Sequence, residues 1–474
     1  MTLVELARAG RSPALPVTLQ LPSGDSLYIS QWLRVLPGQR YVALAQWQGR
    51  SVLAKLLVGT RAARQFQREQ QGALALSAQG MDTPALLAAA ESAQGAWLLF
   101  DYLDGAQSLA EAWDAVAHEA PLSDAQQQVL GEALGAIAQL HRVGLWQDDL
   151  HLDNLMRHAG RLYVIDGGGV RIEMPGQALS RERVLANLGM FFAQLPAYLE
   201  PVIEELLVHY LLVNGEHALP LEALLKEIAK VRRWRLRDYL RKIGRDCSLF
   251  AVERGAGLLR AVRRDALDTL APVLADPDAA IAAGESLKQG GSATVARIAT
   301  GGQTWVIKRY NIKNLLHWLK RCWRPSRAWH SWVAGHHLAQ LGIATPAPVA
   351  VIERRRFWLR ERAYLINAYS AGQDLFQLLG HEGHQPPPEA VGEALQQLFS
   401  QLAAARISHG DLKATNLLWD SGRIALIDLD ALRVHRRYAS WQRAAAVDRA
   451  RLIRNWPVDS PLAVWLESAL DKPA

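Results

Sequence analysis

One segment of this sequence occurs twice at a constant spacing of 262 residues, and this repeat constrains the fold more than any other feature. The first copy reads D-L-H-L-D-N-L at 149–155, and the second reads D-L-K-A-T-N-L at 411–417. In each copy a Gly-Arg pair follows, and then an Ile-Asp pair that ends at Asp166 or at Asp428. Asp to Asn is five positions and Asn to the final Asp is twelve in both copies. An internal repeat is typical of a duplicated structural unit, so the sequence predicts two copies of one domain.

The pattern around each repeat predicts a β-hairpin that gathers three polar side chains. Apolar residues on both sides of a glycine-containing turn indicate two strands, after Asn154 in the first copy and after Asn416 in the second. An Ala- and Leu-rich segment with helical periodicity precedes each repeat, at 124–141 and at 389–405. We therefore expect the two Asp side chains and the Asn side chain of each copy to meet at one end of the hairpin.

Each repeat is preceded by an apolar, strand-like run that carries a single lysine, Lys55 in the first copy and Lys308 in the second. One lysine at a strand end is usually a solvated charge, but the same placement in both copies favours a shared role. A predicted helix after Lys55 carries Glu69. After Lys308 there is no acidic residue before Glu353, so either another group positions this lysine or the second copy is weak or inactive.

The spacing of the repeated residues resembles the catalytic loop of protein kinases, in which D-L-x-x-x-N is followed by a metal-binding Asp. In that chemistry the first Asp accepts the proton of the acceptor hydroxyl, while Asn and the second Asp hold Mg²⁺ on the ATP phosphates. The longer motifs at 140–154 and 409–416, with supporting stretches at 245–250 and 341–346, are similar to the bacterial lipopolysaccharide core kinases of the Kdo/WaaP family in a tandem arrangement.

This resemblance implies an α+β fold of two tandem protein-kinase-like domains, each with a small β-rich N-lobe and a larger helical C-lobe. It also implies ATP and Mg²⁺ as cofactors and a sugar hydroxyl of the lipopolysaccharide core as acceptor. The residues that it assigns are the catalytic bases Asp149 and Asp411, the metal ligands Asn154, Asp166, Asn416 and Asp428, the phosphate contacts Lys55 and Lys308, and the lysine partner Glu69. The backbone of Gly290, Gly291 and Ser292 is expected to contact a phosphate.

Several positions depart from the kinase pattern. The segment 288–295 has glycine at one of three expected positions, and the match at 36–42 is weaker still. Gln147 stands where many kinases have His, and Gly167-Gly168 follows Asp166 instead of Phe-Gly. An extra acid lies beside each site: Asp153 is expected to be solvated, while Asp430 is either solvated or supports the site.

Charge is distributed unevenly along the chain, whose net charge is +7. Residues 1–225 carry a net charge of −8, residues 226–264 of +9, residues 265–275 of −2 and residues 276–474 of +8. A basic second half suggests an anionic partner, although scattered arginines are also explained as solvated charge. Two cysteines exclude a disulfide framework, and the sequence predicts neither a signal peptide nor a membrane span. These features favour a cytoplasmic protein.

The segment 308–337 combines basic residues and tryptophans without any acid, a mixture that suits a membrane interface or an anionic glycolipid. We therefore expect contact with the lipopolysaccharide core or lipid A glycolipid, peripheral contact with the inner membrane and no nucleic-acid partner. The alternative is that the tryptophans pack the N-lobe core and the charges are solvated. The residues concerned are Lys308, Arg309, Lys313, Lys320, Arg321, Arg324, Arg327, Trp318, Trp323, Trp329 and Trp332.

The sequence thus predicts a first kinase-like domain at 1–225 and a second at 226–474, in which 226–285 holds a linker and the start of the N-lobe. The predicted function is ATP-dependent phosphorylation of an inner-core sugar, with heptose favoured, in Gram-negative cell-envelope biosynthesis. Two alternatives stay open. One is a kinase for another small molecule or for protein, and the other is a pseudokinase that scaffolds core assembly, motivated by the missing glutamate after Lys308.

Overall fold

The computed structural model of the chain describes residues 1–311 and 323–470. The chain divides into two compact units, Met1–Trp234 and Arg235–Ala474, and the division falls within helix α7 (Leu221–Lys242). Each unit combines an antiparallel sheet with a group of helices, so both are of mixed α+β construction. Among the described residues, no helix has the length and apolar character that crossing a membrane requires.

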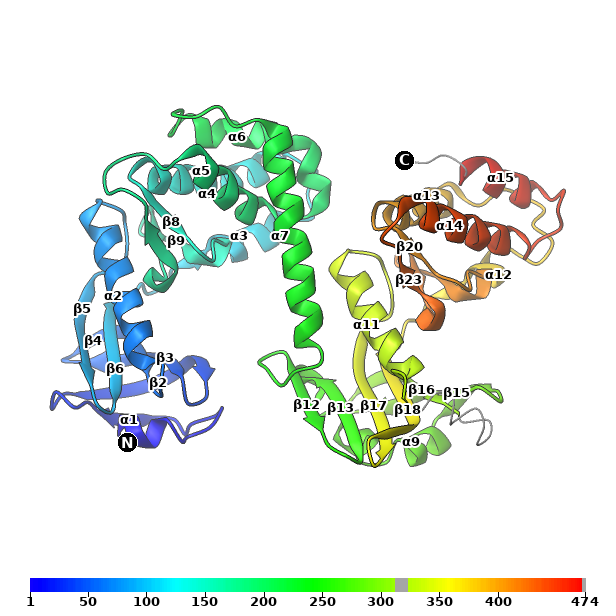
Figure 1. Cartoon of the computed structure of the whole chain (residues 1–474), viewed down its shortest axis with the longest axis horizontal. Helices are drawn as coiled ribbons and strands as arrows, with labels where there is room; N and C mark the ends of the chain where they lie inside the picture. The colour runs from blue at the N-terminus through cyan, green and yellow to red at the C-terminus, as the bar shows by residue number, and fades with distance from the viewer. Residues whose placement is uncertain (312–322, 471–474) are drawn as a thin grey trace. The chain divides into compact units, whose positions relative to one another are not determined.

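The first unit begins with a six-stranded sheet in the order β1-β2-β3-β4-β6-β5. Helix α2 (Ala62–Ala78) lies against this sheet, and its buried Phe66 packs with sheet residues such as Leu98 (Figure 1). Lys55 lies on the inner strand β4, opposite Val42 on one side and Leu98 on the other. The strands are β1 (Val17–Gln20), β2 (Ser26–Leu36), β3 (Arg40–Trp47), β4 (Arg50–Leu57), β5 (Leu86–Ser92) and β6 (Gly95–Asp101), and the short helix α1 (Leu3–Leu6) precedes them.

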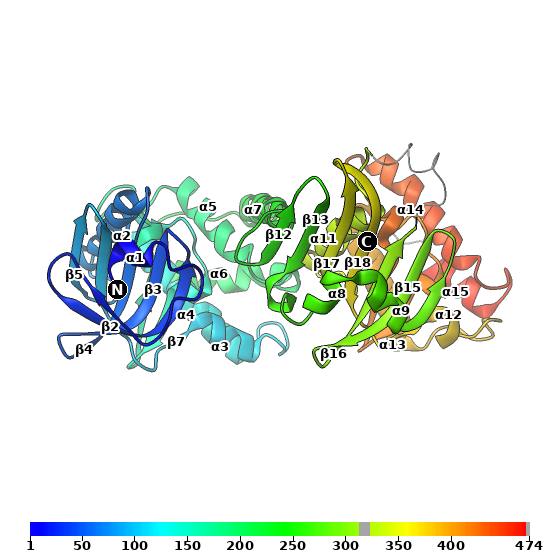
Figure 2. The same ribbon diagram turned by 90° about the horizontal axis from the view of Figure 1, so that it is seen from below.

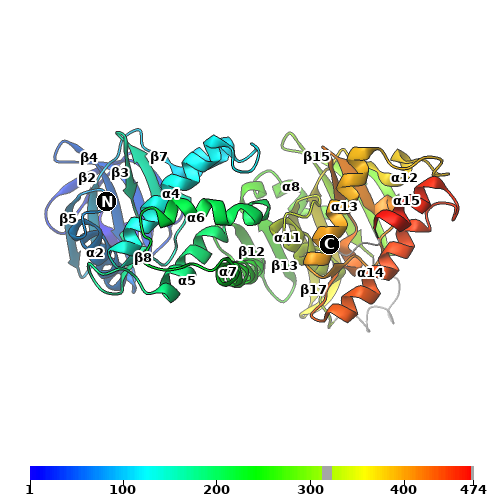
Figure 3. The same ribbon diagram turned by 90° about the horizontal axis from the view of Figure 1, so that it is seen from above.

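The rest of the first unit is mainly helical, and two small sheets carry the repeated motif. A large apolar core, with Leu130, Leu134 and Phe191 among its buried members, joins these helices. Figure 3 shows α4, α5 and α6 gathered together. The helices are α3 (Leu109–Val116), α4 (Asp124–Arg142), α5 (Arg181–Phe192) and α6 (Ile203–Leu211), and the strands are β7 (Gln107–Ser108), β8 (Leu145–Gln147), β9 (Leu155–His158), β10 (Arg161–Val164) and β11 (Val170–Ile172).

The second unit begins with a seven-stranded sheet in the order β12-β13-β17-β18-β16-β15-β14 (Figure 2). Its first two strands come from the segment that the sequence assigns to a linker and the start of the N-lobe. Helix α11 (Arg327–Gln340) packs against β17 and β18. The strands are β12 (Phe250–Arg254), β13 (Leu258–Arg263), β14 (Glu285–Gln289), β15 (Ala293–Thr300), β16 (Gln303–Tyr310), β17 (Pro348–Arg356) and β18 (Leu359–Ala368), and α8 (Ala271–Ala275) and α9 (Pro277–Ala283) precede β14.

A helical part also follows the sheet of the second unit, with α13, α14 and α15 packed around a core that contains Leu395, Leu412 and Leu452 (Figure 3). The elements are β19 (Gln373–Asp374), α12 (Leu375–Leu378), α13 (Glu389–Ala404), β20 (Ile407–Ser408), β21 (Leu417–Asp420), β22 (Arg423–Leu426), β23 (Arg433–Val434), α14 (Tyr438–Ile453) and α15 (Pro461–Ala469).

The local predictions for the repeat are confirmed. The helical segments predicted at 124–141 and 389–405 are α4 and α13. The predicted hairpins are β9–β10, with Leu155 opposite Val164, and β21–β22, with Leu417 opposite Leu426. The two copies of the motif therefore fold into the same local structure.

Candidate active site

The repeated loops hold their polar side chains in the same way in both units. The Nδ2 atom of Asn154 donates to the backbone oxygen of Asp149 at 2.7 Å, and Asn416 donates to the backbone oxygen of Asp411 at 2.8 Å. Each bond closes the loop from Asp to Asn and leaves the amide oxygen as the remaining acceptor of the Asn side chain. Both Asn side chains are largely buried, so this orientation is fixed by the fold.

The second aspartate of each motif has a left-handed backbone conformation, with φ of +65° at Asp166 and +58° at Asp428. Residues with a Cβ rarely adopt this region, and such outliers cluster at functional sites. A 3₁₀ turn follows each residue, at Gly167–Gly169 and at Leu429–Ala431. The two copies therefore share a strained conformation at the position where kinases bind metal.

In the first unit a buried lysine bridges two carboxylates. The Nζ atom of Lys55 lies 2.6 Å from Oε2 of Glu69 and 2.9 Å from Oδ1 of Asp166. Arg40 from β3 contacts the other oxygen of Glu69 at 3.2 Å. Burial alone would lower the pKa of Lys55, but Glu69 and Asp166 outweigh it and the pKa is raised. Likewise burial alone would raise the pKa of Asp166, but Lys55 keeps it lowered. This lysine is therefore a fixed cation.

The glycine triplet Gly167–Gly169 and the single glycine of α2, Gly72, explain the departure from Phe-Gly. A Cβ added to Gly72 would lie 1.8 Å from the backbone oxygen of Gly167, so helix and turn meet backbone to backbone. The N–H of Gly168 then donates to Oε2 of Glu69 at 3.2 Å. The position of Glu69 is thus coupled to the turn that carries Asp166.

In the second unit Lys308 also bridges two carboxylates, but neither comes from an α-helix. Its Nζ atom lies 2.6 Å from Oδ1 of Asp428 and 3.0 Å from Oδ2 of Asp430. Tyr310 and Ser331 donate to the other oxygen of Asp430 at 2.6 and 2.8 Å. Burial alone would raise the pKa of Asp428, but Lys308 lowers it. Asp430 therefore takes the position beside the lysine that Glu69 has in the first unit.

Glu353, the first acid after Lys308, has a different role. It is buried on β17 and forms ion pairs with Arg355 at 2.8 Å and with Arg360 at 3.3 Å. Burial would raise its pKa, but the bonds from Arg355 and from the Ser326 N–H lower it. The carboxylate stabilises the sheet and does not contact Lys308 in the described structure.

The first aspartates of the motifs differ in exposure. The side chain of Asp149 is 79% exposed, and Nε2 of His151 lies 3.8 Å from its Oδ2. The side chain of Asp411 is 29% exposed and contacts Arg451 at 2.7 Å and Lys413 at 3.3 Å. Lys413 and His151 stand at equivalent places in the repeat. A basic side chain therefore accompanies the candidate base in each unit.

Two acids beside Asp149 are distinguished by the structure. Asp148 pairs with Arg171 and with Arg68 at 3.3 Å. Asp153, expected to be solvated, is 68% exposed and lies 3.6 Å from His151. Neither acid contacts the lysine, so Asp149 is the loop carboxylate that remains open to an acceptor.

The residue before each loop makes an equivalent bond in both units, although the residue types differ. The side chain of Gln147 bonds to the backbone oxygen of Ile165, and His409 bonds to that of Ile427, both at 2.9 Å. Gln147 therefore replaces the histidine that kinases often have there and makes the same bond as His409. Asp448 of helix α14 accepts hydrogen bonds from the backbone N–H groups of His409, at 2.6 Å, and Gly410, at 2.9 Å. No sequence argument singled out Asp448, and its place in a helix far along the chain gives no local signal.

The glycine-containing segment of the second unit forms the turn between β14 and β15. Asn311 and Arg327 hold it: Nδ2 of Asn311 donates to the Gly290 oxygen at 3.1 Å, and Arg327 donates to the Ser292 oxygen at 3.0 Å. Arg327 also lies 3.9 Å from Asp430. The turn, with Gly291 at its tip, is thus tied to the residues around Lys308. In the first unit, 36–42 forms the corresponding turn between β2 and β3 and brings Arg40 to Glu69.

The basic and aromatic segment 308–337 is mainly turned inward where it is described. Trp332 has no exposed surface and donates to the backbone oxygen of Ile243, and Lys308 belongs to the site. Trp323 is 71% exposed. The expected membrane surface is therefore wrong for Trp332 and Lys308. Lys313, Trp318, Lys320 and Arg321 lie outside the described residues.

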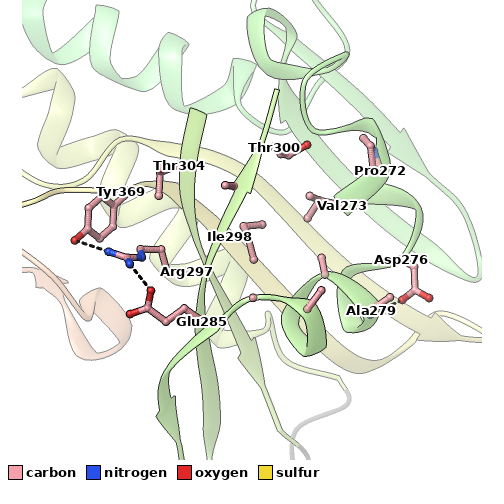
Figure 4. Close-up of a pocket in the computed structure, with 14 residues that line it drawn as sticks. Pro272, Val273, Asp276, Ala279, Glu285, Arg297, Ile298, Thr300, Thr304 and Tyr369 are labelled. Atoms are coloured by element: carbon pink, nitrogen blue, oxygen red, sulfur yellow. Dashed lines mark hydrogen bonds and ion pairs between the residues drawn. The ribbon is translucent and has the colours of Figure 1, made fainter. Parts of the chain in front are cut away.

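Two hollows of the second unit differ in their relation to this site. A small cavity of about 50 Å³ adjoins Lys308, Asp428 and Asp430. A wider pocket of about 780 Å³ lies between α8, α9 and β15, where Arg297 joins Glu285 and Tyr369 (Figure 4). The wider pocket contains none of the repeated residues and is separate from the site.

Residues 283–457 match the family model described as the Lipopolysaccharide kinase (Kdo/WaaP) family. This range holds Lys308, Asp411, Asn416, Asp428 and Asp430, so the C-terminal half carries a kinase-like domain of this family. Among solved structures the chain is similar to one titled "WaaP in complex with acyl carrier protein", at 21% sequence identity and a TM-score of 0.31, with 41% of this chain and 82% of that chain covered. No curated protein matches the chain.

Proposed function

We propose that this chain is an ATP-dependent phosphotransferase that phosphorylates a sugar hydroxyl of the lipopolysaccharide inner core, with heptose the favoured sugar. The observation that carries the proposal is the bridge from Lys308 to Asp428 and Asp430 beside the loop of Asp411 and Asn416, within a Kdo/WaaP-family domain. Phosphoryl transfer depends on positioning and on charge neutralisation, and this arrangement supplies both.

The roles follow from the contacts. Asp411 accepts the proton of the acceptor hydroxyl, as a partly exposed loop carboxylate can do, and Arg451 lies beside it. Lys308 holds the nucleotide phosphates, since two carboxylates fix its position. The oxygens of Asn416 and Asp428 are the hard donors that Mg²⁺ prefers, and the bond from Asn416 to the Asp411 backbone leaves its amide oxygen as the donor. Bound Mg²⁺ would neutralise charge on the phosphates.

We further propose that the first unit is a second kinase-like domain, with its boundary to the second near the division of α7. Lys55, Glu69 and Asp166 form the ion-pair set that kinases require, and Asn154 repeats the bond of Asn416. In this unit Asp149 would accept the proton, Asn154 and Asp166 would hold Mg²⁺, and Lys55 would contact phosphate.

Asp430 bears on the alternative of a pseudokinase in the second unit. That alternative rested on the missing glutamate after Lys308, and Asp430 supplies a carboxylate at 3.0 Å in its place. We therefore favour catalysis over a purely scaffolding role. The backbone of Gly290, Gly291 and Ser292 is proposed to lie over the phosphates, since its turn is held to Arg327 beside Asp430.

The proposal is tested by measuring the phosphate content of the lipopolysaccharide core by mass spectrometry in a deletion strain. The strain is complemented with the wild type, Asp411→Asn, Asp149→Asn or the double variant. We expect loss of core phosphate on deletion, restoration by the wild type and none by the double variant. Each single variant then assigns a phosphate to one unit. A core of unchanged mass after deletion, with purified protein inactive on isolated core and ATP, would refute the proposed acceptor.

A further inference from the structure

The β17–β18 hairpin of the second unit has an unusual tip. Five two-residue hairpin turns in the described chain have both central residues at positive φ. Four of them end in glycine, which adopts this conformation without steric cost. The fifth is Phe357-Trp358, with φ of +49° and +72°. The four others are Gln48-Gly49, Ala159-Gly160, Gly301-Gly302 and Ser421-Gly422.

The fold holds this strained tip in place. Arg356 and Leu359 pair on either side of the turn, and the Trp358 N–H donates to the backbone oxygen of Ala256 at 3.0 Å. A bulky residue at positive φ is a genuine outlier, and an outlier that its surroundings maintain points to a function. Burial of the two side chains does not offset this strain, because Phe357 is 81% exposed and Trp358 is 60% exposed.

The surroundings of the tip are basic and contain a third exposed aromatic side chain. Trp323 is 71% exposed, and Arg360 next to the tip donates to its backbone oxygen at 3.0 Å. Glu353, the acid nearest in the strand, is buried and neutralised by its arginines. The exposed arginines around the tip are Arg254, Arg324, Arg354, Arg356 and Arg362, of which Arg362 pairs with Asp278 at 3.4 Å, against exposed Glu253 and Glu361.

We propose that the Phe357-Trp358 hairpin tip, with Trp323 and these arginines, docks the second unit onto the surface of an anionic membrane. Aromatic rings prefer the interfacial layer of a bilayer, and arginines on the same surface attract anionic headgroups. The unit carrying the tip, Arg235–Ala474, is also the basic one, with 34 Lys and Arg against 22 Asp and Glu.

A membrane fits this surface better than an acidic protein does. A protein partner anchors aromatic side chains in pockets and covers a broad patch, whereas two adjacent exposed rings at a hairpin turn suit insertion into a layer of headgroups. Docking concerns a surface away from Lys308 and needs no nucleotide. It is therefore independent of the proposed transfer reaction, although it would bring the domain to a glycolipid acceptor.

The test is sedimentation of the full chain with vesicles of phosphatidylglycerol and phosphatidylethanolamine, compared with phosphatidylcholine vesicles. The key variant is Phe357→Asn with Trp358→Gly, because Asn-Gly is the pair that such a turn prefers. This variant is expected to keep or raise the melting temperature. Its binding to the anionic vesicles is expected to fall by about tenfold or more, while wild-type binding weakens with salt.

Trp234→Gln is the matched control, since Trp234 is 56% exposed and stands among arginines on α7 instead of on a hairpin. It should leave vesicle binding unchanged, as should Asp411→Asn. Absence of wild-type binding to anionic vesicles would overturn the proposal and leave an acidic protein as the partner. Equal binding by the hairpin variant, or an equal loss with Trp234→Gln, would overturn it as well. If the double variant melts earlier than the wild type, Trp358→Gly alone decides by the same binding measurement.

Discussion

The two units hold an equivalent lysine with carboxylates from different parts of the fold. In the first unit Glu69 reaches Lys55 from helix α2, whereas in the second Asp430 reaches Lys308 from the turn that follows Asp428. Helix α11 of the second unit contributes the hydroxyl of Ser331, which donates to Asp430, and the guanidinium of Arg327, 3.9 Å from Asp430. What the two sites share is a pair of carboxylates beside a lysine, and the element that supplies the second one can change.

This difference has a physical consequence. The partner of Lys55 moves with α2, which touches the Gly167 backbone through Gly72. The partner of Lys308 lies in the same turn as Asp428, so the second site depends less on the position of its helix. We expect the first unit to respond more strongly to changes on the helix, and the second to changes in the turn.

The largest effect is expected from the lysines themselves. Lys308→Met, in a chain that also carries Asp149→Asn, should lower ATP-dependent transfer to the core by about 10²–10³-fold, because a fixed cation beside the phosphates is lost. Lys55→Met with Asp411→Asn should do the same for the first unit. Phosphate transfer is followed with labelled ATP. Lys226→Met, a change at a side chain that is 74% exposed, serves as the control. Full activity of either lysine variant would contradict the shared role.

The second prediction exchanges the carboxylates. Glu69→Gln and Asp430→Asn should each lower transfer by their own unit by about 10–10²-fold, since each lysine keeps one carboxylate partner. Placing a carboxylate on the helix by Ser331→Glu should recover part of the loss in an Asp430→Ala background, because Ser331 already contacts Asp430.

Ser331→Gln in the same background is the control for shape without charge. Recovery with Gln as good as with Glu would show that charge at this position is unimportant. The comparison between the units would then have to be made on packing alone.

The third prediction concerns the contact between helix and turn. Gly72→Ala should destabilise the first unit by about 1–3 kcal/mol, because its Cβ would lie 1.8 Å from a backbone oxygen. Gly335→Ala on α11 should cost less, since its Cβ would meet Cγ of Pro348, at 2.5 Å, which is a side-chain atom. Denaturant unfolding measures both changes. An equal or larger cost at Gly335 would contradict the closer coupling in the first unit.

The last prediction is a pH dependence that both units share, and it is small within any one pH unit. Burial lowers the pKa of His141 to about 4 and that of His336 to about 3, while unfolded histidine titrates near 6.5. The folded pKa is depressed, so the unfolded chain takes up the proton first as the pH falls. Stability should be complete above about pH 6.5 and should fall by about 1.4 kcal/mol for each pH unit and each histidine below it. His141→Gln should reduce the slope of the unfolding free energy of the first unit against pH, with unfolding measured by hydrogen exchange. An unchanged slope would refute this assignment.

The sequence predicted the local structure of the site well and its long-range partners poorly. Hairpins β9–β10 and β21–β22 follow from alternation and a glycine turn, which are local signals. Asp430 was left open and Asp448 was missed, because their partners Lys308 and His409 lie 122 and 39 residues away along the chain. Trp332 was expected at a surface but is buried, because composition cannot tell which face of a helix meets the sheet.

The sequence by itself determined the repeat of the motif, its strand–turn–strand frame, the Asp and Asn residues within it and the lysine that precedes each copy. These features follow from spacing and periodicity, which can be read from the order of residues along the chain. Only the tertiary structure decided which carboxylate stands beside Lys308, that Gln147 and His409 make the same bond, and that Phe357 and Trp358 face outward at a strained tip. Such contacts join residues that the fold alone brings together, and their energies depend on burial and distance instead of on order along the chain.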